Sequence, residues 1–346
     1  MSDAPGALAA RLIEAADDAR YRHPRRALER ALAARDFAAS LQAAELEVRS
    51  DGGTSPRWRW LVLQSDAWAV LASAYRGVGE LDMAEACLLV ALTFLDVVPA
   101  KDDHRRARWA QRASYVRLDQ GRFGEALELL AESRRLYLEL GLEQRAASVR
   151  VDTALVLARS GRRQQAAAQL KRALEVLDRQ QEPRSYLAAV HNMARVLLEV
   201  AKQPEEEQEA LRWLKLAIRE HDRFPEPLNA LRLRALAALT AARLGRVDTA
   251  LANLEELAGA FAAVGAVGDQ VLALLHASEI ALRHGRIDGP EALGAAGRLF
   301  PLLRRLPVDD EAKTALRRLL SSAEESRLSV DAVRRAAVLV ERSLGV

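Results

Sequence analysis

Arg108 and Arg112 lie in a dense basic cluster, which begins Arg105-Arg106 and includes Trp109. Residues four apart in a helix share one face, and two guanidinium groups on one face can bind a carboxylate or phosphate through paired hydrogen bonds. This cluster is the best binding hypothesis in the sequence. The alternative is that the arginines cover a solvent-exposed helix face while Trp109 packs inward, which is a common use of such charge runs.

Two histidine motifs could also carry chemistry. His276 and His284 are eight residues apart with Glu279 between them, whereas metal ligands on one helix are usually three or four residues apart. We therefore expect no metal site there. His191 is followed by Asn192, and this pair is more typical of hydrogen bonding within a groove or between helices than of catalysis.

The sequence contains no catalytic or cofactor motif. It has no phosphate-binding glycine loop, no serine or cysteine nucleophile arrangement and no zinc spacing. Acidic pairs at 102–103 and 309–310 suit the starts of helices, where carboxylates favour the helix dipole. Cys87 is the only cysteine, so no intrachain disulfide can form, and we expect it to be a packing residue. We predict no enzymatic activity, no cofactor and no metal.

Composition favours helices in a water-soluble protein. Of the 346 residues, 50% are apolar but only 5% are aromatic, and alanine and leucine dominate the apolar set. The net charge of +3 is weak evidence for nucleic-acid binding, and we expect none that is direct. No apolar run reaches the ~18 residues of a membrane span, and the first residues lack an apolar signal region. We therefore expect a cytoplasmic protein that binds no membrane.

A short motif recurs along the chain and predicts how it is built. Gly121 is followed by Ala126, Leu130 and Ser133. Further copies contain Gly79 with Ala84, Leu88 and Ala91; Gly161 with Ala166, Leu170 and Ala173; Gly245 with Ala250, Leu254 and Leu257; and, without the glycine, Ala210, Leu214 and Ala217. Copies are 40 to 44 residues apart, a period typical of helical solenoids.

Each copy reads as two helices joined by a tight turn. Glycine lets the chain reverse, and small residues let the two helices approach closely. A degenerate sixth copy opens at Gly285 and has Pro290 in place of the alanine. The residue seven positions before each glycine is also small: Ala72, Ser114, Ala154, Ala238 and Ser278. We predict antiparallel pairs, each with a first and a second helix, near 57–98, 103–140, 143–181, 184–222, 226–264 and 268–304.

The remaining segments predict caps and breaks. Residues 1–50 are expected to form capping helices, the second running from Pro24 to about Val48, and residues 50–56 a loop. Residues 57–304 are the repeat array. Residues 308–346 are expected to form C-terminal capping helices near 309–326 and 329–344. The acidic stretch 201–209 carries about four extra residues, and we interpret it as a lengthened exposed turn, with a functional loop as the alternative.

These motifs resemble the tetratricopeptide repeat family over roughly residues 57–285. Trp68, Leu71, Ala72 and Tyr75 before Gly79 give the fullest first-helix match. The period of about 40 is similar to the longer-helix variant of bacterial regulators, such as maltose-activator-type transcription factors and peptide-sensing regulators. We therefore predict an all-α protein, a right-handed α-solenoid of antiparallel helix pairs. The resemblance implies a superhelix whose concave groove is lined by the first helices.

The resemblance also implies which residues line the groove. The transferred positions are Asp66, Arg108, Gln111, Arg112, Tyr115, Ser148, His191, Asn192, Arg195 and Arg232. Family members that bind chaperone tails use lysine and asparagine on one repeat, asparagine on the next and two basic residues on a third. Only the last part is present, as Arg108 and Arg112, while Asn192 falls on a later repeat. Such a clamp is not expected here.

The leading functional prediction is a non-enzymatic scaffold or adaptor in bacterial signalling or regulation. It would bind a protein or peptide in its groove, and an acidic one if the arginines make the contact. The alternative is a regulatory sensor module that binds a peptide or small molecule and controls a separate effector or transcription regulator. The fold hosts many partners, so the sequence indicates neither the partner nor the oligomeric state.

Overall fold

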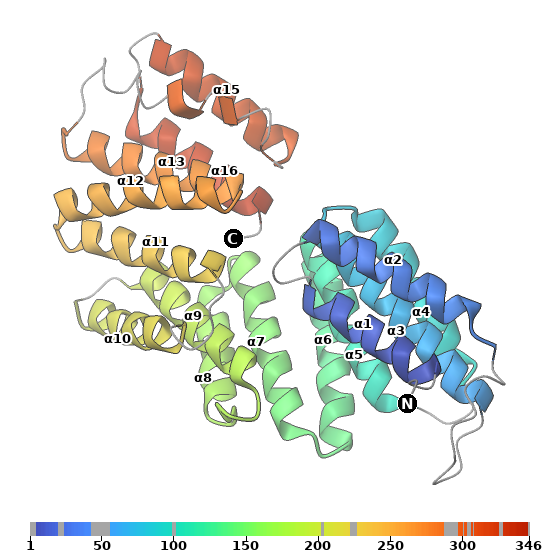
Figure 1. Ribbon diagram of the computed structural model, residues 1–346. Helices are drawn as coiled ribbons and strands as arrows, with labels where there is room; N and C mark the ends of the chain where they lie inside the picture. The colour runs from blue at the N-terminus through green and yellow to red at the C-terminus, as the bar shows by residue number, and fades with distance from the viewer. Residues whose placement is uncertain are drawn as a thin grey trace. The chain divides into compact units, whose positions relative to one another are not determined.

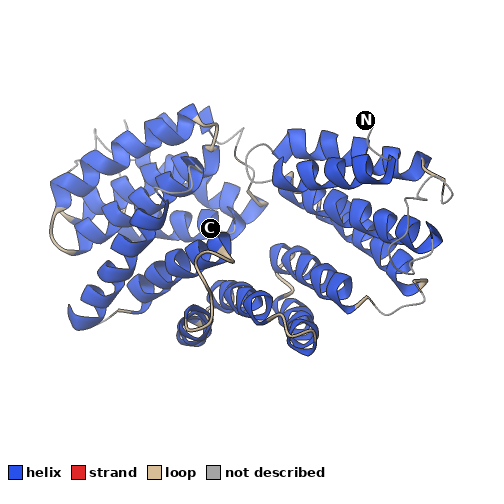
Figure 2. Ribbon diagram, turned by 60° about the horizontal axis from the view of Figure 1, so that its bottom comes forward, coloured by secondary structure: helices blue, strands red, loops and turns tan. Residues whose placement is uncertain are grey.

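The computed structural model describes most of the chain. The described residues are 5–19, 24–42, 56–98, 102–201, 204–221, 227–286, 297–299, 301–302, 306, 308–324 and 328–344. Every regular element within them is a helix (Figure 2). The predicted loop at 50–56 and most of the second helix of the last pair fall outside these residues.

The helices follow one another as hairpins, seen as consecutive pairs along the colour gradient in Figure 1. Their bounds are α1 Pro5–Ala19, α2 Pro24–Ser40, α3 Pro56–Gly77, α4 Leu81–Asp96, α5 Asp103–Asp119, α6 Phe123–Glu139, α7 Glu143–Arg159, α8 Arg163–Leu174, α9 Pro183–Val200, α10 Pro204–His221, α11 Pro227–Arg243, α12 Val247–Ala263, α13 Val267–Arg283, α15 Asp310–Glu324 and α16 Val330–Leu344. The prediction of an all-α solenoid of antiparallel pairs is confirmed.

The turn at Gly121 shows how each hairpin reverses. Gly121 has φ +74°, the left-handed conformation that glycine adopts without a steric penalty. Its N–H donates to the Leu118 carbonyl at 3.0 Å, and the Arg122 N–H donates to the Arg117 carbonyl at 2.8 Å. This is the Schellman motif, which satisfies the last carbonyls of the helix. The same geometry at Gly141 ends the second helix of this pair and starts the next one.

The small residues lie where the helices of a pair touch. Ala84, Ala126, Ala166, Ala210 and Ala250 are each 0% exposed. The equivalence of the hairpins extends to hydrogen bonds. The Ser65 hydroxyl donates to the Ala91 carbonyl, and the Ser133 hydroxyl donates to the Ala107 carbonyl, at 2.9 and 2.8 Å. These pairs occupy the same two repeat positions, with the serine on the first helix in one hairpin and on the second helix in the other.

The chain forms two compact units, residues Met1–Tyr186 and Leu187–Val346, with the boundary in the first turn of α9. In unit 1, α1 and α2 pack on each other and both contact α3. Ala9, Ile13 and Ala31 join the core around Leu71. In unit 2, α16 packs on α13 and α15, and Leu275, Leu316 and Val340 belong to one core.

Two predicted boundaries were wrong. The helix after Pro24 ends at Ser40 rather than near Val48. The extra residues of the fifth copy do not lengthen a turn, because helix α10 already begins at Pro204. They form an added first turn that carries Glu205, Glu206 and Glu207, where carboxylates favour the positive end of the helix dipole.

Candidate functional site

The first helices α1, α3, α5 and α7 form what we call the first-helix face of unit 1. Among the predicted groove residues, Arg108, Gln111, Arg112 and Tyr115 lie on α5, and Ser148 lies on α7. Ion pairs and hydrogen bonds connect these four helices, so the face is a continuous polar surface. Some polar side chains on this face form hydrogen bonds or ion pairs within the chain, and others form fewer.

Gln111 and Tyr115 converge on one carboxylate. Gln111 Nε2 donates to Asp152 Oδ2, and the Tyr115 hydroxyl donates to Asp152 Oδ1, each at 2.5 Å. Asp152 lies on α7, on the next repeat, and was missed by the sequence analysis. Counting residues in the repeat finds it, because Asp152 stands at the same offset from Gly161 as Arg112 does from Gly121.

A second group of charges ties the same helices together. Arg76 Nε on α3 lies 2.7 Å from Asp119 Oδ2, and Arg159 Nη1 on α7 lies 2.9 Å from Asp119 Oδ1. The Arg76 guanidinium also stacks over the Tyr115 ring, 4.9 Å from its centroid, a cation–π contact. These residues hold three successive first helices in register, so we assign them a structural role.

Arg112 is paired with the N-terminal helix. Its Nη2 lies 3.0 Å from Asp17 Oδ2 on α1, and its side chain is only 11% exposed. The two residues are 95 positions apart in sequence, so local patterns gave no sign of the contact. The two arginines predicted to act together therefore differ, because Arg112 already forms an ion pair with Asp17 of its own chain.

Arg108 is a cation on this face that has no ion pair with the described residues. It makes no hydrogen bond or ion pair with any residue in the described part of the chain. Burial lowers the pKa of His104, one turn away, and the positive charge of Arg108 lowers it further. Burial likewise raises the pKa of Tyr137, while Arg108 and Arg145 act in the opposite direction because they favour the phenolate. The positive charges of Arg108 and Arg145 thus act on the same two side chains.

The repeat frame explains why Arg108 has no partner among the described residues. Asp66 and Arg232 occupy the same position as Arg108, thirteen residues before the glycine of their own repeat. Asp66 lies 3.1 Å from Arg105 Nε, and Arg232 binds Asp269 at 2.6 and 3.0 Å. Both partners stand sixteen residues before the next repeat's glycine. For Arg108 that position is Arg145, which carries the same charge.

Ser148 does not present its hydroxyl to a ligand. The residue is 6% exposed, and its hydroxyl donates back to the Gln144 carbonyl of its own helix at 3.1 Å. Its position in the repeat is that of Arg108, but the side chain is too short to leave the packed surface. Arg145, by contrast, is 57% exposed and pairs with Glu182 at 3.1 Å.

The other four candidates lie in unit 2, with His191, Asn192 and Arg195 on α9 and Arg232 on α11. Arg232 forms the two hydrogen bonds to Asp269 described above. The His191 ring meets the His221 ring edge-on, with centroids 6.0 Å apart. Burial lowers the pKa of His191 to about 3, aided by the charge of Arg195, so the imidazole is neutral at physiological pH.

The remaining titratable candidates have structural environments. Cys87 is 3% exposed within α4, and burial raises its pKa to about 11, so its thiol stays protonated and unreactive at neutral pH. His276 Nε2 lies 3.1 Å from Glu341 Oε1 on α16. Among the described residues, no group of three or more His, Cys, Asp or Glu is placed to hold a metal ion.

Comparison with solved structures places this arrangement of helices among known folds. A Rap protein complexed with Competence and Sporulation Factor superposes with a TM-score of 0.64 at 12% identity, covering 98% of this chain and 88% of that one. The Rap conjugation gene regulator of the plasmid pLS20, in complex with the Phr* peptide, gives 0.56 at 11% identity and full coverage of both chains. The chain has a tetratricopeptide-repeat-type fold.

Two further neighbours of this tetratricopeptide-repeat-type chain widen the range of functions on the fold. Aspartyl phosphate phosphatase F from Bacillus subtilis has a TM-score of 0.54 at 14% identity, covering 97% of this chain and 96% of that one. A signal-transduction ATPase with a tetratricopeptide repeat sensor from Pyrococcus horikoshii has 0.56 at 12% identity, covering 83% and 43%. No protein-family model and no curated protein matches the sequence. At such identities the likeness concerns the fold alone.

None of the described helices combines the length and the apolar character needed to cross a bilayer.

Proposed function

We propose that this chain is a non-enzymatic regulatory protein that binds an acidic peptide, or an acidic segment of a partner protein, on the first-helix face of unit 1. The observation that carries the proposal is Arg108, whose guanidinium has no ion pair with the described residues and whose partner position in the repeat holds a second arginine, Arg145. In the two equivalent places of the repeat, an acidic residue completes an ion pair. A ligand carboxylate would supply the missing negative charge at Arg108.

The neighbouring contacts support this role energetically. Gln111, Tyr115 and Arg112 are held in place by Asp152 and Asp17, so the surface beside Arg108 is preorganised. A charge-assisted hydrogen bond to Arg108 contributes about 1.5–3 kcal/mol. A peptide would therefore need further contacts along the face. We expect its specificity to depend on several polar contacts spread over the first helices.

A second candidate function, a sensor that controls a separate effector, is favoured by the structural neighbours. They include a conjugation gene regulator in complex with the Phr* peptide and a signal-transduction ATPase with a tetratricopeptide repeat sensor. The two functions differ in what binding does. A sensor changes the protection of amide hydrogens far from the peptide, whereas a scaffold changes only those that the peptide covers.

The test is a selection of displayed peptides on the whole chain. We expect the enriched peptides to carry Asp or Glu and to lose about tenfold or more in affinity against Arg108→Glu, since the substitution replaces attraction by repulsion. Arg30→Glu is the matched control, because Arg30 is an exposed arginine on a second helix, α2. Enrichment of neutral or basic peptides, or equal binding to both variants, would remove Arg108 from the site.

The absence of enzymatic activity remains a prediction. One structural neighbour is called an aspartyl phosphate phosphatase, so acetyl phosphate and a phosphorylated response regulator are the substrates to assay. We expect the rate of phosphate release to equal that of the buffer control.

A further inference from the structure

A groove opens on the opposite side of unit 1, among the second helices. It lies between α4 and α6 above α5, and its volume is about 340 Å³. We call it the α4–α6 groove. Its lining residues are Glu85, Leu88, Leu89, Trp109, Ala113, Arg117, Glu125, Glu128, Leu129 and Glu132.

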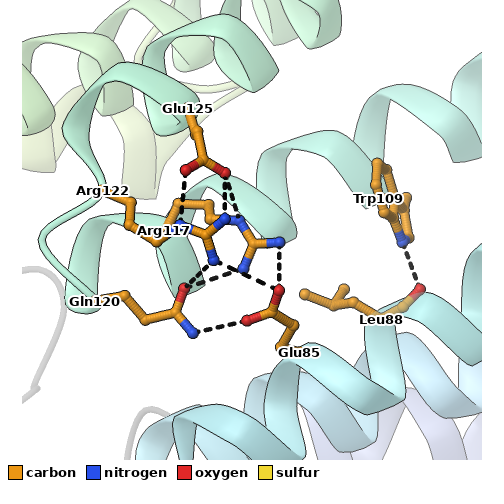
Figure 3. A network of polar contacts seen from close by, with 7 residues as sticks. All are labelled: Glu85, Leu88, Trp109, Arg117, Gln120, Arg122 and Glu125. Carbon is orange, nitrogen blue, oxygen red and sulfur yellow. Dashed lines mark hydrogen bonds and ion pairs between the residues drawn. The ribbon is translucent and has the colours of Figure 1, made fainter.

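Trp109 forms part of the apolar floor of this groove. Its Nε1 donates to the Leu88 carbonyl on α4 at 2.8 Å, as Figure 3 shows. The equivalent residues of the other repeats are smaller and at most 2% exposed: Ala67, Val149, Ala189, Leu233 and Ala273. Trp109 is partly exposed instead. The tryptophan departs from the repeat and brings an aromatic surface to the second-helix side.

Leu89 is a second departure from the repeat, at the edge of the same groove. Leu89 is 56% exposed, although burying a leucine side chain stabilises a folded protein. The same position in the other second helices is small or charged: Ala131, Lys171, Lys215 and Glu255. The repeat therefore does not need an apolar side chain here, and packing within the chain does not explain why Leu89 is present.

One end of the groove is closed by a compensated ion network. Arg117 lies 2.6 Å from Glu85 and 3.3 Å from Glu125, and Arg122 also contacts both carboxylates (Figure 3). A hydrogen bond from Arg117, joined by one from Gln120, holds the pKa of Glu85 below its usual value. Two guanidinium groups thus balance two carboxylates, and we assign this end a structural role.

The other end of the groove carries excess negative charge. Glu128 is exposed and makes no ion pair with the described residues. Glu132, one turn further along α6, is about half exposed and shares Arg135 with Glu139. Apolar surface at Leu89 and Trp109 next to an uncompensated carboxylate is complementary to a segment that joins a bulky apolar side chain to a lysine or arginine.

We propose that the α4–α6 groove docks a basic, apolar segment of a partner protein. The apolar side chain would cover Leu89 and Trp109, and the cation would pair with Glu128. This inference goes beyond the proposed function, because it concerns the second helices and a ligand of opposite charge. A regulatory protein with an acidic ligand on one face and a basic partner on the other could bind both at once.

The experiment uses a displayed library of short helical peptides in which Arg or Lys is fixed one turn from Leu, Phe or Trp, together with its charge-reversed library. Binding is followed in the ¹⁵N-labelled chain through the indole N–H signals of its five tryptophans, with Trp109 assigned from Trp109→Phe. We expect basic peptides to shift the Trp109 signal saturably, and Leu89→Lys to weaken them about tenfold. Lysine already occupies this position in two other repeats, so the variant should fold.

Leu138→Lys is the matched control, since Leu138 is also an exposed leucine, 44% exposed, on α6. The proposal is overturned if neither library shifts Trp109, if acidic peptides bind equally well, or if Leu89→Lys and Leu138→Lys weaken binding alike. A dimer, detected by light scattering and dissolved by Leu89→Lys, would show that a second copy fills the groove instead. Arg108→Glu should leave basic-peptide binding unchanged, so this test and that of the proposed function can fail separately.

Discussion

Arg108 in unit 1 and Arg232 in unit 2 occupy the same position of the repeat but have different surroundings. Arg232 makes two hydrogen bonds to Asp269, whose side chain is only 10% exposed. Arg108 makes none within the described residues, because the corresponding residue of the next repeat is Arg145. The residue type at one position of the repeat therefore does not decide whether that residue forms an ion pair. The charge on the following helix does.

The largest effect expected at neutral pH is on the pair in unit 2. Asp269→Ala leaves the guanidinium of Arg232 without its partner, and we expect the free energy of unfolding to fall by about 1.5–3 kcal/mol. Urea denaturation followed by circular dichroism measures the loss. Asp248→Ala is the control, because its pair with Arg286 is exposed, and it should cost less than about 1 kcal/mol. Equal losses would mean that the Arg232 pair is no stronger than a surface ion pair.

The next effect concerns the acid sensitivity of unit 2. The pKa of His191 is lowered from 6.5 to about 3 in the folded chain, so the unfolded chain binds the extra proton between these values. The contribution of the neutral His191 to the free energy of unfolding is therefore complete above pH 6.5. It is lost as the pH falls, by up to about 1.4 kcal/mol for each pH unit. His191→Gln should flatten the dependence of the unfolding midpoint on pH between 6.5 and 4. Parallel curves for the two proteins would contradict the buried, neutral imidazole.

A smaller effect on stability is expected at Arg108, which has no ion pair with the described residues of unit 1. Arg108→Glu places a carboxylate at the repeat position of Asp66, with Arg145 at the position of Arg105. The variant thus has the same arrangement of charges as the Asp66–Arg105 ion pair. We expect stability to rise by about 0.2–1 kcal/mol while acidic-peptide binding falls, measured by urea denaturation and fluorescence anisotropy on one preparation. A variant that loses both stability and binding would indicate that Arg108 supports the fold and is not held available for a ligand.

The smallest effect is expected at Ser148. Its hydroxyl bonds within its own helix, so Ser148→Ala should change the free energy of unfolding by no more than about 0.5 kcal/mol. The affinity for a selected acidic peptide should also be unchanged. A clear loss of affinity, measured by titration calorimetry, would show that the hydroxyl turns outward to meet the peptide and would restore Ser148 to the site.

Local chemistry explains how much of the fold could be predicted. Gly121 permits one tight turn, and Ala126 permits one close contact between helices. Because both effects are local, the spacing of such residues in the sequence revealed the hairpins. The end of α2 at Ser40 was missed because Ala38, Leu41 and the residues after them still follow helical spacing. The extra residues before Ala210 were misread because Pro204 was taken as a break, although proline also suits the first turn of a helix.

The site could be predicted only in part, because its contacts span different distances in sequence. The pairing of Arg112 with Asp17 depends on the packing of α1 and leaves no periodic signal. Asp269 and Arg145, in contrast, stand at fixed offsets in the repeat, and counting charges along two repeats would have found both. The contact of Trp109 with α4 could not be predicted from helix spacing or from the repeat offsets. Helical spacing alone does not show which of two neighbouring helices a large side chain contacts.

The pairing rule between successive first helices also bears on how such arrays diversify. Arg108 and Arg232 show that one residue, on the following repeat, decides whether the arginine at this position forms an ion pair with the next first helix. A single substitution in the following repeat can therefore pair or release such an arginine. The glycines and alanines that build the hairpins need not change.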